Sequence, residues 1–172
     1  MPSKFWRARS VAVLVLLGAW ASNSWAANPV VDFVAQLIED AQSGYQEFRA
    51  TIEKDYGPTD QYWTCKKAPP NVAACSINVR VSPEYNAYFV HWCYDSKSTA
   101  ESDRESLSDQ IAAAYGPGQV LFRDNTRMGW HVGSNMKIQV YQDRFCETDI
   151  LGELKPSVHL EVIYDPKSRL PW

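Results

Sequence analysis

The feature that most constrains the fold of this 172-residue chain is a partial repeat of its own sequence. Two segments, Ile52–Pro58 and Ile111–Pro117, both end in Tyr-Gly-Pro and lie 59 residues apart. Two further matches follow at offsets of 61 and 70: Ile77–Val79 with Ile138–Val140, and Val90–Asp95 with Leu160–Asp165. The growing offset indicates longer loops in the second copy. We therefore expect two copies of one set of elements, at about 44–95 and 101–165.

A helical pattern of apolar residues precedes each Tyr-Gly-Pro motif. Its members are Val30, Phe33, Val34, Leu37, Ile38, Ala41, Tyr45, Phe48 and Ile52 in the first copy, and Leu107, Ile111 and Ala114 in the second. Gly57 and Gly116 are expected to end these helices. Extended segments follow near 61–66, 75–81 and 87–94, and near 120–124, 137–141 and 158–164.

These patterns predict an α+β fold in which two helix–three-strand repeats form a mostly antiparallel sheet packed with helices. An extra N-terminal helix is expected over about 29–41. The strand at 158–164 alternates, with Val158, Leu160 and Val162 on one side and His159 and Glu161 on the other. Transferring this register to the first copy predicts that Tyr88, Val90, Trp92 and Tyr94 face the core, and that Phe89, His91 and Cys93 face away.

Residues 1–26 have the composition of a signal peptide. Lys4, Arg7 and Arg9 precede an apolar run, Val11–Trp20, and Ser24-Trp25-Ala26 fits a cleavage site before Ala27. The run is about ten residues long, whereas a membrane span needs about 20. Because no cysteine lies near the cleavage point to accept a lipid, we expect a single soluble domain, 27–172, without a membrane anchor. The leader looks bacterial, which predicts the periplasm; a eukaryotic secretory route stays open.

Export favours disulfides among the four cysteines. We expect Cys65 to pair with Cys75 across a hairpin-like connection, leaving Cys93 with Cys146. In the chain-entropy model the two bonds contribute on the order of 2–3 and 4 kcal/mol. The cysteines form no Cys-x-x-Cys pair and the histidines lack zinc-ligand spacing, so no metal site is predicted.

Charge and motifs exclude several classes of function. Of the 17 basic side chains three lie in the leader, which leaves 14 against 20 acidic ones, a net charge near −6. This balance argues against nucleic-acid binding, which needs basic surface. The chain has no Gly-x-Ser-x-Gly elbow, no glycine-rich phosphate loop and no carboxylate pair above chance. Cys93, two residues from His91, is expected in a disulfide rather than as a nucleophile. We predict no catalytic residue, no cofactor and no enzyme.

Loop composition suggests a binding protein instead. The segment 123–135 mixes arginine, methionine and tryptophan with short polar residues, a combination enriched in protein interfaces. The connection at 141–156 is long and charged, and 95–104 is polar and serine-rich. The candidate partner-binding residues are Arg123, Asp124, Asn125, Arg127, Met128, Trp130, Asp143 and Arg144. The alternative for 123–135 is an ordinary hairpin whose Trp130 folds back into the core.

With its Ser24-Trp25-Ala26 leader, its even set of cysteines and its loops, the chain resembles the periplasmic immunity proteins of type VI secretion, especially those that neutralise peptidoglycan amidases. The resemblance is one of format and not of a motif. It implies an inhibitor that inserts a loop, 123–135 or 95–104, into the active site of a cell-wall-degrading toxin. Many such toxins are basic, so an acidic inhibitor would meet them faster.

A second function stays open beside the first. The protein would be a structural or ligand-binding component of the envelope, with an aromatic-lined pocket between the sheet and the helices. The residues that would line this pocket are Tyr62, Trp63, Tyr88, Trp92 and Tyr94. The sequence does not indicate the oligomeric state.

Overall fold

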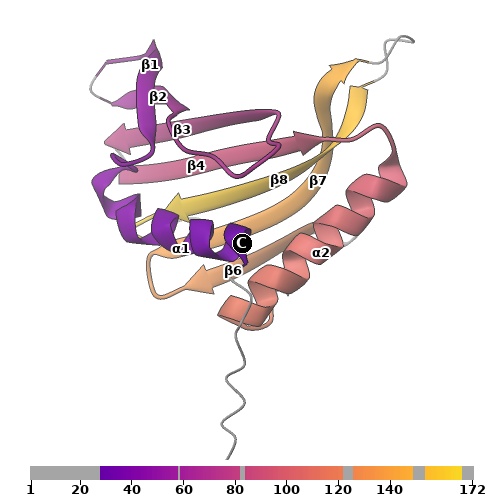
Figure 1. Cartoon of the computed structure of the whole chain (residues 1–172). Coiled ribbons are helices and arrows are strands. Elements are labelled where there is room, and N and C mark those ends of the chain that lie inside the picture. The colour runs from indigo at the N-terminus through magenta and orange to yellow at the C-terminus, as the bar shows by residue number, and fades with distance from the viewer. Residues whose placement is uncertain (1–27, 58, 82–83, 122–125, 149–153, 168–172) are drawn as a thin grey trace, which may run out of the picture.

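A computed structural model describes residues 28–167, apart from 58, 82–83, 122–125 and 149–153 (Figure 1). Within these residues the chain forms two helices and one antiparallel sheet of eight strands, in the order β1-β2-β3-β4-β8-β7-β6-β5. The helices are α1 (Pro29–Asp40), followed by the 3-10 turn η1 (Ala41–Ser43), and α2 (Lys97–Tyr115). The strands are β1 (Arg49–Asp55), β2 (Asp60–Cys65), β3 (Ala74–Val81), β4 (Glu84–Cys93), β5 (Gln119–Val120), β6 (Arg127–Val132), β7 (Met136–Thr148) and β8 (Leu154–Tyr164).

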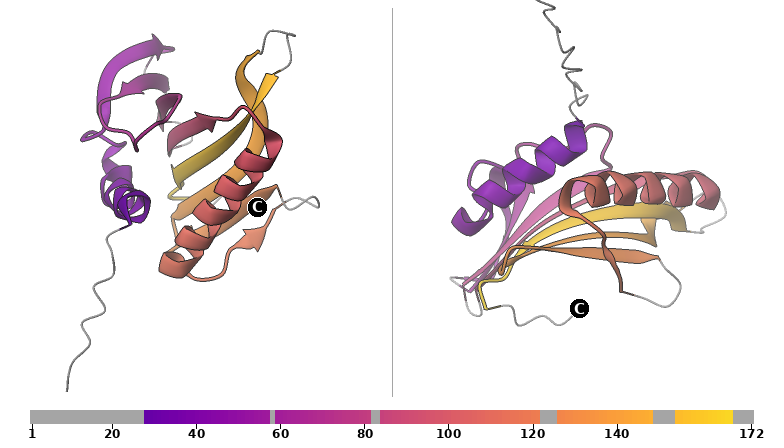
Figure 2. Two further views of the ribbon diagram at one scale, coloured as in Figure 1. Left: turned by 45° about the vertical axis from the view of Figure 1, so that its right-hand side comes forward. Right: turned by 90° about the horizontal axis from the view of Figure 1, so that it is seen from below.

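Both helices lie on the same face of the sheet, as the view from below in Figure 2 shows. We call this the covered face and its opposite the open face. Each helix begins at a polar cap: the Asn28 side chain accepts a hydrogen bond from the Val30 backbone N–H, and Ser96 accepts one from Thr99. The helices bury apolar residues against the sheet, among them Leu37 of α1 and Ile111 of α2. The core therefore lies between one sheet face and two helices.

The predicted strand faces are confirmed in both central strands. Tyr88 and Val90 of β4 are buried in the core, and Trp92 and Tyr94 pack against it. Val158, Leu160, Val162 and Tyr164 of β8 belong to the same core. Strands β4 and β8 pair side by side, with Val90 opposite Leu160 at the centre of the sheet. The predicted α+β class with a mostly antiparallel sheet is thus correct.

The prediction that a helix runs from about 44 to the first Tyr-Gly-Pro motif is wrong. Gly44 adopts a left-handed conformation (φ 76°) and its N–H caps η1, so the helical part ends at Ser43. A single tight turn then places Tyr45 and Phe48 in the core, which accounts for their helical spacing. Beyond this turn the chain extends into β1, which contains Ile52, and Gly57 lies between β1 and β2. Gly116, by contrast, does end a helix.

The predicted repeats also have too few strands. Four strands follow each helix rather than three. The difference arises because the prediction assigns β1 to a helix and β6 to a loop. A helix followed by four strands occurs twice, from α1 to β4 and from α2 to β8, so the helix expected as an extra at the N-terminus precedes the first four strands. The repeat boundaries of about 44–95 and 101–165 stay a prediction. The repeated Tyr-Gly-Pro motifs do not lie in equivalent elements.

Both predicted disulfides are present. Cys65 on β2 bonds Cys75 on β3, and Cys93 on β4 bonds Cys146 on β7. The first ties the end of β2 to the start of β3, at the base of the β1–β2 hairpin. The second spans the central strands, since β8 lies between β4 and β7. Among the described residues, neither helix is long and apolar enough to cross a membrane. Residues 1–26, where the signal peptide is predicted, lie outside the described part.

Candidate functional site

Strand register brings four planar side chains together on the open face. Arg127 on β6 is directly opposite Tyr141 on β7, Tyr141 is opposite His159 on β8, and His159 is opposite His91 on β4. The next position along this line is Ala74 on β3, opposite His91. We call these five residues the stacked row. Residues directly opposite one another on antiparallel strands point to the same face, so the row crosses five of the eight strands.

The planar groups of the stacked row lie against one another. The rings of Tyr141 and His159 are parallel, with 4.5 Å between centroids and 4° between planes. His91 continues the row at 5.3 Å from His159 with a 35° tilt. On the other side, the guanidinium carbon of Arg127 lies 4.0 Å from the centroid of the Tyr141 ring, a cation–π geometry. The row is therefore a continuous stack from Arg127 to His91.

A partly buried carboxyl supports the stack from the neighbouring row. The Tyr141 hydroxyl donates a hydrogen bond of 2.5 Å to Oε1 of Glu161 on β8. Burial is the main cause that raises the pKa of Glu161, and the hydrogen bond from Tyr141 partly offsets it. Burial, and then the nearby Glu161, raise the pKa of the Tyr141 hydroxyl. Tyr141 therefore keeps its proton and acts as a fixed donor to this carboxyl.

The two histidines of the row are neutral at neutral pH. Burial, and then repulsion from His91, lower the pKa of His159 to about 4. Burial also lowers the pKa of His91. His159 Nε2 lies 2.8 Å from the Ser157 hydroxyl, which donates its proton to the carbonyl oxygen of Asp143. The Ser157 hydroxyl thus lies within hydrogen-bond distance of both the His159 ring and the Asp143 carbonyl.

This serine–histidine pair does not have the arrangement of a hydrolase. A serine nucleophile gives its proton to the histidine and faces the substrate. Ser157 instead gives its proton to a backbone carbonyl, and its residue is fully buried, with 0% exposed. The pair therefore fixes the orientation of the His159 ring.

A cavity of about 470 Å³ lies over the stacked row and is lined by its members from Ala74 to Tyr141. Its lining combines ring edges with carboxylates and includes Glu53, Ala74, Ser76, His91, Asp143 and Glu161. Glu53 comes from β1, so the β1–β2 hairpin forms one wall. Neither α1 nor α2, the helices of the described residues, covers this face of the sheet, so the cavity is open on their far side.

The β1–β2 hairpin itself is unusually exposed. It forms the edge of the sheet opposite to β5, and after Arg49 every residue of β1 is exposed (Figure 1). Ile52 and Tyr56, at 41% and 64%, are among the most exposed large hydrophobic residues in the described chain. Tyr56 packs edge-on against Tyr62 of β2. The hairpin thus presents apolar side chains beside the cavity.

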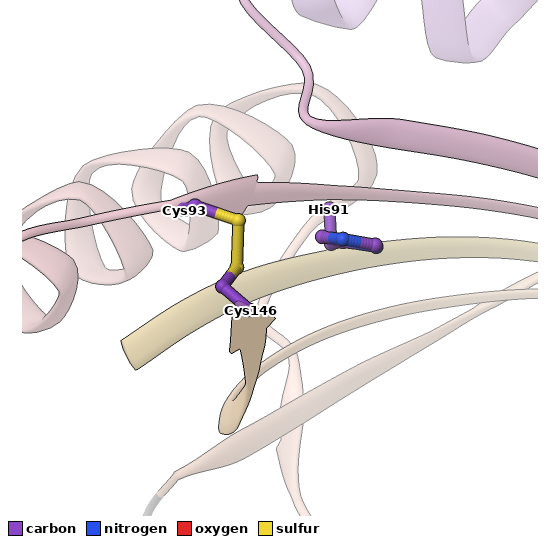
Figure 3. Close-up of side chains that lie close together, drawn as sticks. All are labelled: His91, Cys93 and Cys146. Carbon is purple, nitrogen blue, oxygen red and sulfur yellow. A yellow bond between two sulfur atoms is a disulfide. The ribbon is translucent and has the colours of Figure 1, made fainter. Parts of the chain in front are cut away.

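His91, Cys93 and Cys146 form a group with the composition of a soft-metal site (Figure 3). Their candidate ligand atoms lie within 4.8 Å of one another. Metal binding needs thiolates, whereas both sulfur atoms are committed to the disulfide drawn in Figure 3. In this oxidised state the group is a structural link rather than a metal centre.

The structure brings two of the predicted partner-binding residues to this site. Arg127 begins the stacked row, and Asp143 lines the cavity. Arg144 is exposed and lines a separate cleft of about 870 Å³ near the start of α2. Met128 packs against the core. Arg123, Asp124 and Asn125 lie outside the described residues.

Trp130 is predicted to contact a partner, but the structure buries it. It is 2% exposed, and its indole N–H donates to the carbonyl oxygen of Gly116. The ring packs against Gly118, where an added Cβ would lie 2.6 Å from it. Trp130 therefore belongs to the covered face, as the alternative interpretation of 123–135 had it.

Sequence reasoning did not nominate Tyr141, His159 or Glu161 for the site. Alternation along β8 did place His159 and Glu161 on the face away from the core. What the sequence lacked was the register that joins β4, β8, β7 and β6. Without it, residues 91, 127, 141 and 159 give no sign that they meet.

A smaller cavity of about 230 Å³ lies on the covered face beside α2, lined by Trp92, Tyr94, Leu107 and others. Only part of the predicted aromatic pocket is found there. Tyr88 is buried in the core, with its hydroxyl donating to the Lys67 carbonyl, and Trp63 lies below the guanidinium of Arg49. Tyr62 contacts the hairpin tip instead.

Comparisons of the chain with protein-family models, with curated proteins and with solved structures found no match.

Proposed function

We propose that this protein is an exported inhibitor that binds and blocks a cell-wall-degrading enzyme, most concretely a periplasmic immunity protein against a peptidoglycan amidase toxin. The observation that carries the proposal is the exposed β1–β2 hairpin beside the cavity of the open face. This pair of features replaces the loop at 123–135 as the inserting element, since Trp130 is buried.

The hairpin has the properties that favour tight binding through insertion. The Cys65–Cys75 disulfide holds its base, so little conformational entropy is lost when a partner fixes it. Its tip presents Tyr56, and tyrosine is a residue type that often dominates interface energies. The adjoining cavity offers a pocket for a side chain of the partner.

Charge and compartment also support the proposal. A net charge near −6 after the leader would speed encounter with a basic enzyme. Two disulfides favour an oxidising compartment, which fits export by the predicted signal peptide to the periplasm. The full burial of Ser157 favours binding over hydrolysis, in line with an inhibitor that is not itself an enzyme.

Affinity capture tests this proposal. The full chain with its own leader and a C-terminal tag is used to capture partners from periplasmic extract. We expect a stoichiometric complex with a hydrolase, and loss of peptidoglycan cleavage by the captured enzyme. Tyr56→Ala should weaken the complex by about 2 kcal/mol, roughly thirty-fold in Kd. Capture of no hydrolase would contradict the proposal.

A matched pair of aliphatic variants controls this experiment. Ile52 is exposed on β1, and Val120 is exposed on β5 at the opposite edge of the sheet. We expect Ile52→Ala to weaken the complex and Val120→Ala to leave it unchanged. Equal effects would mean that the hairpin is not the contact.

A second candidate function is favoured by the cavity beside Trp92 and Tyr94. There the protein would bind a small apolar or glycan ligand between the sheet and α2. Titration with glycan fragments or lipids should then change tryptophan fluorescence, and Trp92→Leu should abolish the change. A change that survives in Trp92→Leu would contradict a ligand at this cavity.

We also propose that the two halves of the fold arose by duplication of a helix–four-strand unit. The order of elements is the same from α1 to β4 and from α2 to β8. The offset of 70 makes Val90 equivalent to Leu160, and these residues face each other across the β4–β8 pair. If a twofold axis relates the two halves, one residue of β4 must pair with its own equivalent on β8, as Val90 pairs with Leu160. In this proposal the hairpin and the connection after β7 are where the copies diverged.

A further inference from the structure

The stacked row has a planar side chain at every position except its last. Arg127, Tyr141, His159 and His91 stack in turn, but the position opposite His91 is Ala74. The alanine methyl group leaves space beside His91, and His91 and Ala74 both line the cavity. The cavity, which also extends over His159 and Tyr141, therefore includes the place where the next member of the stack would be.

We propose that this space is a slot for a guanidinium group, and that the enzyme bound by this protein inserts an arginine side chain there, stacked on His91 and paired with Glu53. The inference rests on the proposed function, because it assigns the slot to that partner. It goes beyond the proposal by naming the chemistry of the contact.

The chain itself supplies the precedent for such a stack. At the other end of the row, Arg127 places its guanidinium 4.0 Å from the centre of the Tyr141 ring. Guanidinium groups stack on planar rings because they are flat and weakly hydrated, a property that the lysine ammonium lacks. The neutral state of the His91 ring, whose pKa is lowered by burial, removes the repulsion that an imidazolium would cause.

Two exposed carboxylates line the cavity that contains the slot. Glu53 is exposed on the hairpin, and Asp143 is exposed on β7. A carboxylate accepts two parallel hydrogen bonds from one guanidinium, which gives both affinity and orientation. Arg127 lies at the far end of the row, with the rings of Tyr141 and His159 between. An arginine of a basic partner thus meets acidic groups and a planar surface together.

The direct probe is N-acetyl-arginine amide, followed by NMR of the imidazole resonances of the chain's three histidines. We expect saturable shifts of the His91 resonances, smaller ones for His159, and none for His131, which lies on β6 and outside the cavity lining. The matched probes are the citrulline amide, which is planar but uncharged, and the lysine amide, which is charged but not planar. Equal binding of either one would overturn the proposal.

Two pairs of variants locate the slot. Ala74→Leu fills it, whereas Ala73→Leu changes the exposed neighbouring residue, which is not among the described lining residues. Glu53→Gln removes the paired carboxylate, whereas Glu84→Gln removes an exposed carboxylate at the start of β4. We expect Ala74→Leu and Glu53→Gln to weaken binding of the arginine probe at least about five-fold, and the control variants to leave it unchanged. Circular dichroism confirms that each variant is folded.

The probe and the partner separate the two proposals. If the arginine amide binds as described but no hydrolase is captured, the proposed function fails and the guanidinium slot stands without this partner. If a hydrolase is captured and Ala74→Leu binds it as tightly as the unchanged chain does, the slot is overturned and the function stands. Absence of saturable His91 shifts with the arginine amide also overturns the slot.

Discussion

The two faces of the sheet are stabilised in different ways. The covered face is apolar, and residues such as Leu160 and Ile138 are fully buried under the helices. The open face has no helix above it, and its centre is held by ring stacking and by one hydrogen-bonded carboxyl, Glu161. His159 and Leu160 are neighbours on β8, yet the first takes part in ring stacking and the second in the apolar core. The covered face therefore contributes the apolar core, and the open face is where we propose recognition.

The largest effect is expected from the disulfide that joins the central strands across the open face. The Cys93–Cys146 bond closes a separation of 53 residues, and Cys65–Cys75 closes one of 10. Replacing both cysteines by alanine should cost about 4 kcal/mol for the first pair and about 3 kcal/mol for the second. Urea unfolding measures both free energies. A larger loss from the Cys65–Cys75 pair would mean that the hairpin contributes more to stability than the open face does.

The comparison between faces is sharpened by two alanine substitutions at adjacent positions of β8. Leu160→Ala should cost about 3 kcal/mol, because it opens a cavity in a fully buried site. His159→Ala should cost about 1 kcal/mol, through loss of stacking and of its contact with Ser157. The same unfolding experiment measures both. Equal losses would contradict the division between a stabilising and a recognising face.

Tyr141→Phe isolates the hydrogen bond to Glu161 while keeping the stack. We expect a loss of about 1 kcal/mol in the free energy of unfolding, since the partly buried carboxyl loses its donor. The pKa of Glu161 should rise further, which NMR titration of its carboxyl carbon detects. An unchanged pKa would show that Tyr141 does not determine the state of this carboxyl.

The last expected effect is on the pH dependence of stability. The pKa of His159 is about 4 in the folded chain, below the value near 6.5 of an unfolded histidine. Between these values the unfolded chain binds more protons, so the free energy of unfolding should fall as pH drops from about 6.5 to about 4. Glu161, whose pKa is raised, acts in the opposite direction just above pH 4.5. The net change is therefore modest.

His159→Phe tests this dependence because it keeps a ring in the stack and removes the titrating group. We expect the difference in unfolding free energy between pH 7 and pH 5 to be smaller in the variant than in the unchanged chain. His91, whose pKa is also lowered, supplies the dependence that remains. The same difference in both chains would contradict the assignment to His159.

The sequence predicted the covered face better than the open one for a physical reason. Burial against helices imposes alternation on a strand, and the residues from Val158 to Tyr164 show it in one local segment. Cysteine spacing and export likewise predicted both disulfides. Local signals of this kind do not depend on which strands are neighbours.

Prediction failed at two places in the core, and it missed the open face, which depends on long-range register. Tyr45, Phe48 and Ile52 have helical spacing, but Gly44 ends the helical part and a single turn accounts for the first two. Trp130 has the composition of an interface residue, yet the close approach of Gly118 makes room for it in the core. The stacked row crosses five strands whose pairing no local pattern reveals.

Paired charge reversals on the two faces test the central claim most directly. Glu53 lies beside the cavity of the open face, and Glu105 is exposed on α2, on the covered side. The measurement is the Kd of each variant for the captured hydrolase. The account predicts that Glu53→Arg weakens binding at least about ten-fold and that Glu105→Arg leaves it unchanged. Weakening by Glu105→Arg without any effect of Glu53→Arg would contradict it, because the partner would then bind over the helices.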